Sequence, residues 1–346
     1  MGKFKVSILG ATGMVGQAFV LLLNDHPYFE IKHLVASDRR EGKKYRDSTR
    51  WLLPGKIPEN VGELELESID KFLGEKKNTE NKIVFSALPS DVAAEVEPEL
   101  SSSGYFVFSN ASAMRYREDV PILIPEANVD SISLIEKQGF PQAGFVVTNA
   151  NCSTTGLAVA LAPLRKFGIE QVFVSTYQSI SGAGYPGIAS LDILGNVLPY
   201  IEGEEKKIQV ELKKILGVSA EVYPYCFRVP VDFGHLETIW VKFEKQVNES
   251  DIREAWEELS GESFGIPTMP KKPIAYLEDS FNPQPRLAFA GDIPGMVVFT
   301  GRLRKENNMI GFVLLVNNII KGAAGGSVQN AEVFVKKYGR VLGWEK

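Results

Sequence analysis

The chain has 346 residues, of which 44% are hydrophobic and 23% charged, and its formal net charge is −5 at pH 7. This length allows two domains with buried cores, and the composition is that of an ordinary globular protein. The acidic balance excludes an extended basic surface for nucleic acid, and no apolar run is long enough for a membrane-spanning helix.

Two cysteines and three histidines form neither a disulfide framework nor a cluster of metal ligands, so we expect no metal site. The first residues lead directly into a strand pattern, and we therefore expect no signal peptide. A cytoplasmic location and a small-molecule substrate, rather than nucleic acid or a membrane, follow as expectations.

The N-terminal segment carries a nucleotide-binding pattern. Residues 5–9 predict a buried strand, and a glycine-rich turn leads from it into a helix over residues 17–24. Glycines in such a turn let the backbone approach a pyrophosphate at the helix N-terminus. The spacing G-x-x-G-x-x-G is a variant of the usual dinucleotide fingerprint. We predict cofactor contacts at Gly10, Thr12, Gly13, Met14, Val15 and Gly16.

The second predicted strand, residues 31–36, ends in a polar and basic run. NAD-binding proteins place an acidic residue at this strand end for the ribose 2′-OH, whereas NADP-binding proteins use arginine. Ser37, Arg39 and Arg40 therefore favour NADP. Asp38 lies within the same run and would serve NAD if the register shifted by one residue.

Strand and helix patterns continue to alternate through residues 82–88, a helix after Ser90, and residues 105–109. This alternation predicts a parallel sheet with helices on both faces. Ser86 and Leu88 lie at a strand's carboxyl end, where such sheets bind ligands. We predict a Rossmann-like α/β domain over residues 1–148, to which a C-terminal helix within residues 326–346 returns.

The pattern changes in residues 149–325. Longer strands are predicted at 171–181, 237–243, 296–302 and 309–320, with a helix-rich segment at 188–216 and a proline-rich stretch at 266–286. These features predict an α+β catalytic and dimerisation domain with a mostly antiparallel sheet. One face of such a sheet needs a cover, and a second subunit would provide it. We expect a homodimer or homotetramer.

Cys152 lies between a strand-like run, residues 144–147, and a helix-like run, residues 157–161. A thiol at a helix N-terminus suits a nucleophile, because the helix dipole favours negative charge there. The dipole contributes only about 0.3–1 kcal/mol, less than the roughly 1.36 kcal/mol that one pKa unit requires. A partner base is therefore needed.

Three histidines are available as that base. His26 follows the first predicted helix and is expected at the surface, whereas His33 lies within a strand and is expected to be structural. His235 lies at the start of a predicted strand in the second domain and is the best general base. The second cysteine, Cys226, is expected to be buried and structural.

Several segments together resemble one enzyme family: residues 10–16, 109–115, 148–156, 178–184 and 228–235. Taken in this order, they closely resemble the aspartate-semialdehyde dehydrogenases, in particular the archaeal and fungal branch. The resemblance implies NADPH-dependent reduction of L-4-aspartyl phosphate to L-aspartate 4-semialdehyde and phosphate. This reaction is a step toward lysine, threonine, methionine and isoleucine.

The resemblance also implies roles for particular residues. Cys152 corresponds to the acylated nucleophile, His235 to the acid/base and Gln178 to a residue that positions the substrate. The remaining implied contacts are Arg228, Glu204 and Asn151 for the substrate, Arg115, Lys207 and Asn110 for phosphate, and Ser181, Gly182 and Asn318 for the nicotinamide half of the cofactor. The run 202–207 also permits a register slip at Glu204 and Lys207.

Several related enzyme families share this architecture but differ from the chain at particular residues. Glyceraldehyde-3-phosphate dehydrogenases carry a second cysteine four residues after the first, where this chain has Gly156, and N-acetyl-glutamyl-phosphate reductases flank their cysteine with proline and glycine. Archaeal malonyl-CoA reductase shares several short sequence segments with this chain, but malonyl-CoA has no ammonium group that Glu204 could bind. An inactive NADP-binding sensor would lack Cys152 or His235, and both are present.

Overall fold

The computed structural model describes residues 2–74 and 82–343 of the chain. The chain divides into two compact units. The first unit comprises Met1–Leu123, Asp130–Asn149 and Ala324–Lys346, and the second comprises Ile124–Val129 and Ala150–Ala323. The short segment 124–129 was expected in the first domain and belongs instead to the second unit. None of the helices in the described residues has the length and apolar character needed to cross a membrane.

The first unit is built on a parallel six-stranded sheet in the order β3-β2-β1-β4-β5-β6. Its strands are β1 (Phe4–Leu9), β2 (Phe29–Val35), β3 (Leu66–Glu67), β4 (Ile83–Ser86), β5 (Phe106–Ser109) and β6 (Phe145–Thr148). Leu9 pairs with both Val35 and Ser86, so these strands end at one edge of the sheet. The strand order reverses between β1 and β4, which is where open α/β sheets bind ligands.

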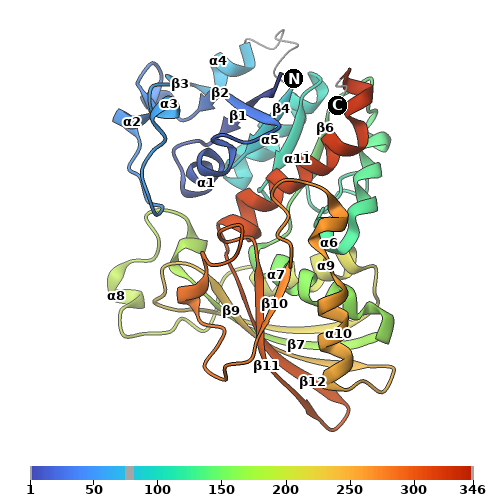
Figure 1. Cartoon of the computed structure of the whole chain (residues 1–346). Helices are drawn as coiled ribbons and strands as arrows, with labels where there is room; N and C mark the ends of the chain where they lie inside the picture. The colour runs from blue at the N-terminus through green and yellow to red at the C-terminus, as the bar shows by residue number, and fades with distance from the viewer. Residues whose placement is uncertain (1, 75–81, 344–346) are drawn as a thin grey trace. The chain divides into compact units, whose positions relative to one another are not determined.

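The helices of the first unit flank this sheet (Figure 1). They are α1 (Met14–Leu23), α2 (Tyr45–Ser48), α3 (Glu59–Gly62), α4 (Ile69–Gly74), α5 (Ser90–Ser102) and α11 (Gly325–Tyr338), with the short helices η1 (Asp38–Arg40), η2 (Val129–Gln138) and η8 (Gly339–Leu342). Helix α11, red in Figure 1, contacts α1 and β5. Its Phe334 ring lies 4.8 Å from that of Phe145, within a cluster of buried phenylalanines.

The second unit contains a mixed six-stranded sheet in the order β10-β11-β12-β9-β7-β8. Its strands are β7 (Ile169–Gln178), β8 (Glu221–Arg228), β9 (His235–Phe243), β10 (Ile274–Leu277), β11 (Val298–Glu306) and β12 (Met309–Val316). The central pairings are antiparallel, as predicted, whereas β8 and β10 join the edges in parallel. The sequence did not predict β8 or β10. The overall division into a Rossmann-like sheet and an α+β domain is confirmed.

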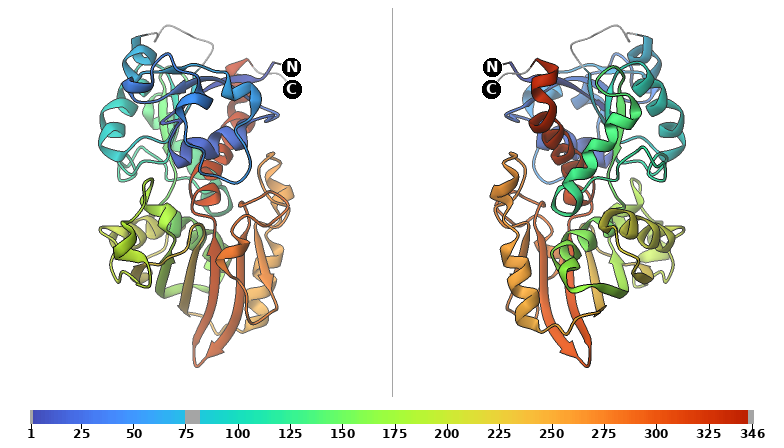
Figure 2. Two further views of the ribbon diagram at one scale, coloured as in Figure 1. Left: turned by 90° about the vertical axis from the view of Figure 1, so that its left-hand side faces the viewer. Right: turned by 90° about the vertical axis from the view of Figure 1, so that its right-hand side faces the viewer.

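One face of this mixed sheet is covered by helices. Helix α7 (Cys152–Leu161) contacts β12 and β9, α9 (Glu204–Leu216) contacts β8, and α10 (Glu249–Glu258) contacts β10 and β11. The remaining helical segments are α6 (Pro125–Asn128), α8 (Ser190–Ile193), η3 (Ala162–Phe167), η4 (Ile180–Ala183), η5 (Gly261–Phe264), η6 (Pro285–Leu287) and the π-helical η7 (Ile320–Ala324). The β11–β12 hairpin forms the end of the unit in Figure 2.

The two histidines of the first unit are structural. His26 was expected at the surface, and that prediction is wrong: it is buried, with Nε2 2.8 Å from Glu332 of α11. Its burial depends on a helix far along the chain, which local sequence does not reveal. His33 on β2 lies 2.7 Å from Glu67 on the neighbouring β3.

Candidate active site

Cys152 is the first residue of α7, and Asn151 is the N-cap. The Asn151 side-chain oxygen accepts from the backbone N–H groups of Ser153 and Thr154 at 3.1 and 3.2 Å. An asparagine cap of this kind fixes where a helix starts, so the cap also fixes the place of the thiol. Gly156 lets α7 approach β12, because a Cβ there would lie 2.8 Å from Val316.

His235 faces this thiol from the start of β9, with Nε2 3.2 Å from Cys152 Sγ. The ring is fully buried. Burial, and then the positive charge of Arg228, lowers the pKa of His235 to about 3. The resting imidazole is therefore neutral at physiological pH.

The other ring nitrogen of His235 is held by Ser179. The Ser179 backbone N–H donates to Nδ1 at 3.1 Å, and its Oγ lies 3.2 Å from the same atom. A backbone N–H can only donate, so the neutral ring carries its proton on Nε2, toward the sulfur. The sequence analysis missed Ser179, and its only signal was adjacency to Gln178 at the end of β7.

Glu204, the first residue of α9, forms the acidic part of the site. Its Oε2 accepts from Asn151 Nδ2 at 2.6 Å and from Gln178 Nε2 at 3.2 Å, while Oε1 accepts from Lys207 Nζ at 2.8 Å. Burial raises the pKa of Glu204, but Lys207 and the two amides outweigh it and leave the pKa below its ordinary value. Glu205 instead accepts from the backbone N–H of Cys226 on β8, so of these two carboxylates it is Glu204 that lies beside Asn151 and Gln178.

Arg228 ends β8 directly opposite Gln178, the last residue of β7. Its Nη1 donates to the Ser179 carbonyl at 2.8 Å, and burial lowers the guanidinium pKa. Gly182 lies against both Arg228 and His235, since a Cβ there would come 2.7 Å from Arg228 Nη1 and 3.0 Å from the imidazole. A side chain at position 182 would displace the site.

Three further side chains complete the second unit's cluster. Asn318 donates from Nδ2 to Ser181 Oγ at 2.9 Å and accepts at Oδ1 from the Gly234 N–H, also at 2.9 Å. Ser179 Oγ donates to the same Oδ1 at 3.1 Å, which links the predicted nicotinamide contacts to the histidine. The sequence analysis also missed Glu211, whose carboxylate accepts from the Asn151 N–H at 2.6 Å.

Cys226 is not part of this reactive cluster. It is fully buried on β8, and burial raises the pKa of its thiol to about 12. A thiol with this pKa is not ionised near neutral pH and does not act as a nucleophile.

The first unit carries the predicted nucleotide loop after β1. Gly10 has φ of +72°, and a Cβ there would lie 2.6 Å from the Ala87 carbonyl oxygen. A Cβ on Gly16 would lie 2.2 Å from the Gly10 oxygen. Gly13 caps α1 without a side-chain hydrogen bond, so the helix N–H groups are available for an anion. Thr12, Met14 and Val15 occupy the same turn and first helical residues.

The residues predicted to select the cofactor lie at the end of β2. Ser37, Asp38 and Arg39 are exposed and Arg40 is half-buried, in and beside η1. Among the described residues, neither arginine forms an ion pair within the chain. Both guanidinium groups are therefore available to a 2′-phosphate.

The predicted phosphate contacts of the first unit follow β4 and β5. Asn110 donates to the Ser86 carbonyl at 3.0 Å and accepts from Asn149 Nδ2 at 2.7 Å. Arg115 is buried and donates from Nη2 to the Asn110 carbonyl at 2.8 Å. Leu88 lies two residues beyond the end of β4. The hydrogen bonds fix this loop at the carboxyl edge of the sheet.

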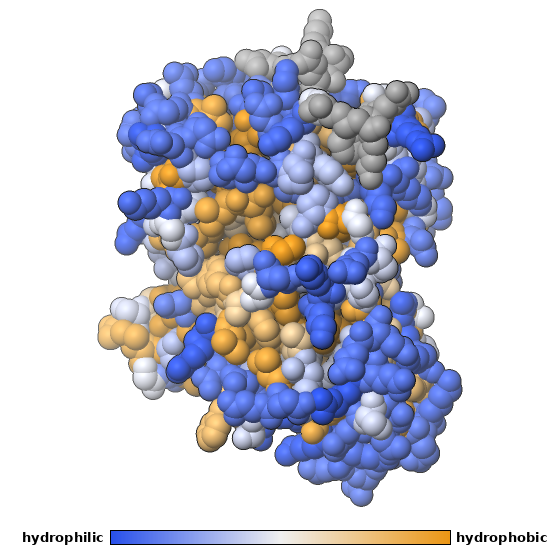
Figure 3. Space-filling model, viewed as in Figure 1, coloured by the Kyte–Doolittle hydropathy of each residue, from blue (hydrophilic) through white to orange (hydrophobic). Residues whose placement is uncertain are grey.

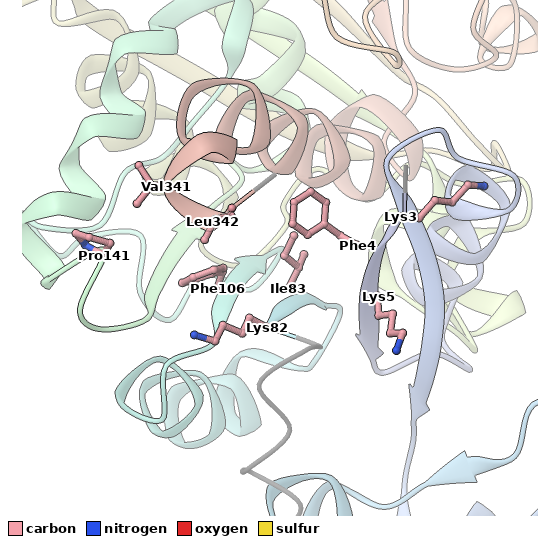
Figure 4. A pocket seen from close by; sticks show the side chains of 11 residues that line it. Lys3, Phe4, Lys5, Lys82, Ile83, Phe106, Pro141, Val341 and Leu342 are labelled. Atoms are coloured by element: carbon pink, nitrogen blue, oxygen red, sulfur yellow. The ribbon is translucent and has the colours of Figure 1, made fainter. Parts of the chain in front are cut away.

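A separate cavity of about 560 Å³ lies at the opposite, amino edge of the same sheet (Figure 4). Phe4, Ile83 and Phe106, which begin β1, β4 and β5 respectively, form part of its wall, with Lys5 and Lys82 beside them. Since the glycine loop is at the carboxyl edge, this cavity is distinct from the predicted cofactor site.

Comparisons with known proteins agree with this arrangement. The semialdehyde dehydrogenase NAD-binding domain family matches residues 5–135, and the semialdehyde dehydrogenase dimerisation domain family matches residues 161–321. An aspartate-semialdehyde dehydrogenase from Archaeoglobus fulgidus is 42% identical, covering 97% of this chain and 99% of the relative. One from Schizosaccharomyces pombe is 41% identical, covering 96% and 98%.

Further matches include both of the main alternatives left by the sequence. A malonyl-CoA reductase (NADP) from Metallosphaera sedula is 37% identical, covering 96% of this chain and 97% of the relative. The solved structure of aspartate semialdehyde dehydrogenase with NADP from Candida albicans matches with a TM-score of 0.85 and 36% identity, covering 96% of this chain and 98% of that one. A Vibrio cholerae aspartate semialdehyde dehydrogenase II complexed with ASA matches with a TM-score of 0.80 and 27% identity, covering 98% and 100%.

Proposed function

The chain belongs to the aspartate-semialdehyde dehydrogenase family, and we propose that it reduces L-4-aspartyl phosphate to L-aspartate 4-semialdehyde with NADPH, releasing phosphate. The observation that carries this proposal is the contact of 3.2 Å between Cys152 Sγ and His235 Nε2, with Arg228 and Glu204 beside it. The reaction supplies an aldehyde for lysine, threonine, methionine and isoleucine synthesis.

Substrate recognition follows from three charged groups. The Arg228 guanidinium forms two parallel hydrogen bonds to the substrate α-carboxylate, and Glu204 binds the α-ammonium. Asn151 and Gln178 donate to the Glu204 side chain and orient its carboxylate. Arg115, Lys207 and Asn110 are the proposed phosphate contacts. A substrate that carries carboxylate, ammonium and phosphate matches this set of side chains.

The first chemical step is acyl transfer. The Cys152 thiolate attacks the acyl carbon, a carbon–sulfur bond forms, and the carbon–oxygen bond to phosphate breaks. The N-terminus of α7 and the Nε2–H of His235 both favour the thiolate. Phosphate leaves with the bonding electron pair, and its charge is compensated by arginine and lysine.

The residues of the first unit fit a nicotinamide dinucleotide. Gly10 and Gly16 leave room that a Cβ would fill, and Gly13 leaves the N-terminus of α1 open to a pyrophosphate. Ser37, Arg39 and Arg40 would bind the 2′-phosphate that distinguishes NADP, and Ser86 and Leu88 would border the dinucleotide. NADPH, when bound, supplies the hydride that reduces the thioester.

In the second step His235 manages one proton. It enters this step as the imidazolium, having taken up the thiol proton of Cys152, and donates from Nε2 to the thioester oxygen as that oxygen gains charge. The ring is then neutral, and the resulting thiohemiacetal is bonded to Cys152. Return of the hydroxyl proton to His235 lets the carbon–sulfur bond break, which releases the aldehyde and restores the thiolate. Ser181, Gly182 and Asn318 would border the nicotinamide beside this histidine.

A direct assay separates this function from thioester reduction. Purified protein with L-aspartate 4-semialdehyde, phosphate and NADP should form NADPH only when phosphate is present. In a second cuvette, malonyl-CoA should not oxidise NADPH. Oxidation only in the second cuvette would overturn the proposal and place the chain with the reductases. A Cys152→Ala variant is the matched control and should be inactive in both.

We also propose that two copies of the chain associate through the second unit, which matches a dimerisation domain. The face of its sheet opposite the helices carries stacked aromatic pairs, Phe173 with Tyr223 and Tyr177 with Phe227, and Tyr225 there is 66% exposed. Apolar side chains are also exposed around α8, at the left of Figure 3, including Leu191. Light scattering on wild type and Tyr225→Asp tests this, with a smaller mass expected for the variant.

Cys152 must remain a free thiol for this chemistry, so we place the enzyme in a reducing compartment, the cytoplasm.

A further inference from the structure

Glu204 and Lys207 form an ion pair inside the site where each was predicted to bind a different part of the substrate. Lys207 Nζ lies 2.8 Å from Glu204 Oε1, and the two residues lie one helical turn apart on α9. The Glu204 side chain is 10% exposed and that of Lys207 is 30% exposed. The pair therefore occupies the proposed ammonium position before any substrate arrives.

Three hydrogen bonds already occupy most of the roughly four acceptor positions of the Glu204 carboxylate, and a second cation beside Lys207 on Oε1 would be repelled by it. The second oxygen of the carboxylate accepts from Asn151 Nδ2 and Gln178 Nε2, both on buried residues. Displacing either amide would leave a buried donor without its partner, which costs more than a hydrogen bond is worth. Lys207 is more exposed and has a flexible four-carbon stem, so it is the group that an incoming ammonium displaces.

We propose that the substrate opens this pair by exchange: its ammonium replaces Lys207 on Glu204, and its phosphate receives the released Lys207. The inference rests on the proposed function, which supplies a substrate with both groups. Through this exchange each charge keeps an opposite partner. A ligand with only one of the two groups leaves either Glu204 or Lys207 without one, which is unfavourable in a partly buried site.

The exchange makes Lys207 and Glu204 a joint specificity device. A thioester without an ammonium, such as malonyl-CoA, does not release Lys207. Because coupling between two sites is reciprocal, an ammonium ligand raises the affinity for phosphate by the same factor as phosphate raises the affinity for the ammonium ligand.

The test measures binding of inorganic phosphate by calorimetry, without cofactor or substrate. Glu204→Gln keeps the side-chain shape and frees Lys207, so phosphate should bind about tenfold more tightly, equivalent to about 1.4 kcal/mol. Glu205→Gln is the matched control, since Glu205 bonds to the Cys226 N–H on β8 and the variant changes net charge equally. Its phosphate affinity should stay within about twofold of wild type.

A second arm uses small ligands on the wild-type protein. L-2-aminobutyrate carries carboxylate and ammonium, whereas butyrate carries the carboxylate alone. Only L-2-aminobutyrate should tighten phosphate binding, and Glu204→Gln should abolish that effect. Equal phosphate affinities in wild type and Glu204→Gln, or an equal gain in Glu205→Gln, would overturn the exchange. These measurements need no turnover, so an inactive wild-type enzyme would refute the proposed function alone.

Discussion

Acid should measurably lower the free energy of unfolding through His235. The imidazole is fully buried, and burial together with Arg228 lowers its pKa from 6.5 to about 3. Below pH 6.5 the unfolded chain binds a proton at this residue that the folded chain does not. Stability then falls by about 1.36 kcal/mol per pH unit, or about 2 kcal/mol by pH 5 and about 5 kcal/mol by pH 3.

His235→Asn removes the titrating group and keeps an acceptor for the Ser179 N–H. Urea unfolding of wild type and variant, at one protein concentration and at pH 7.5, 6.5 and 5, gives the free-energy difference between them. Wild type should lose about 2 kcal/mol relative to the variant between pH 6.5 and 5, and Cys152→Ser should follow wild type. If the stability of wild type relative to His235→Asn stays constant or increases as the pH falls, the folded site holds an imidazolium, and the reasoning fails.

Three further substitutions test neighbouring residues. Arg228→Lys replaces a forked donor with a point charge, so kcat/KM for L-aspartate 4-semialdehyde should fall about 10- to 100-fold through KM; a loss in kcat alone would contradict carboxylate binding. Gly182→Ala brings a methyl group against Arg228 and His235 and should lower kcat at least about tenfold while circular dichroism stays unchanged. Burial raises the pKa of Glu237 well above 4.5, so wild-type stability should fall with rising pH above 4.5; Glu237→Gln should flatten that slope in unfolding experiments at pH 5 and 8.

Local sequence patterns were sufficient to predict those features of the fold and the site that depend on a single stretch of the chain. The glycine loop, the strand before it and the helix after it are adjacent in sequence, and Cys152 was placed at a helix start from its flanking runs alone. His235 could be chosen because the chain has only three histidines.

Features that depend on distant partners could not be predicted in this way. Strand β8 contains Pro224, which discourages a strand assignment, but β8 lies at the sheet edge, where proline is tolerated. Burial of His26 is created by Glu332, 306 residues away. The Glu204–Lys207 pair could be read from spacing as an ordinary surface helix pair. Its burial, and its amide donors from α7's cap and β7, appear only in the folded chain.

The charge on Arg228 gives the proposed mechanism an order of events. In the resting site burial, and then this charge, lowers the pKa of His235, so the ring is neutral with its proton on Nε2. A substrate α-carboxylate bound to Arg228 cancels that charge and raises the pKa of the ring. The second proton then goes to Nδ1, which gives up the hydrogen bond from the Ser179 N–H and donates instead to Ser179 Oγ, 3.2 Å away, while that hydroxyl donates to Asn318. Substrate binding therefore favours the protonated ring that thioester reduction requires.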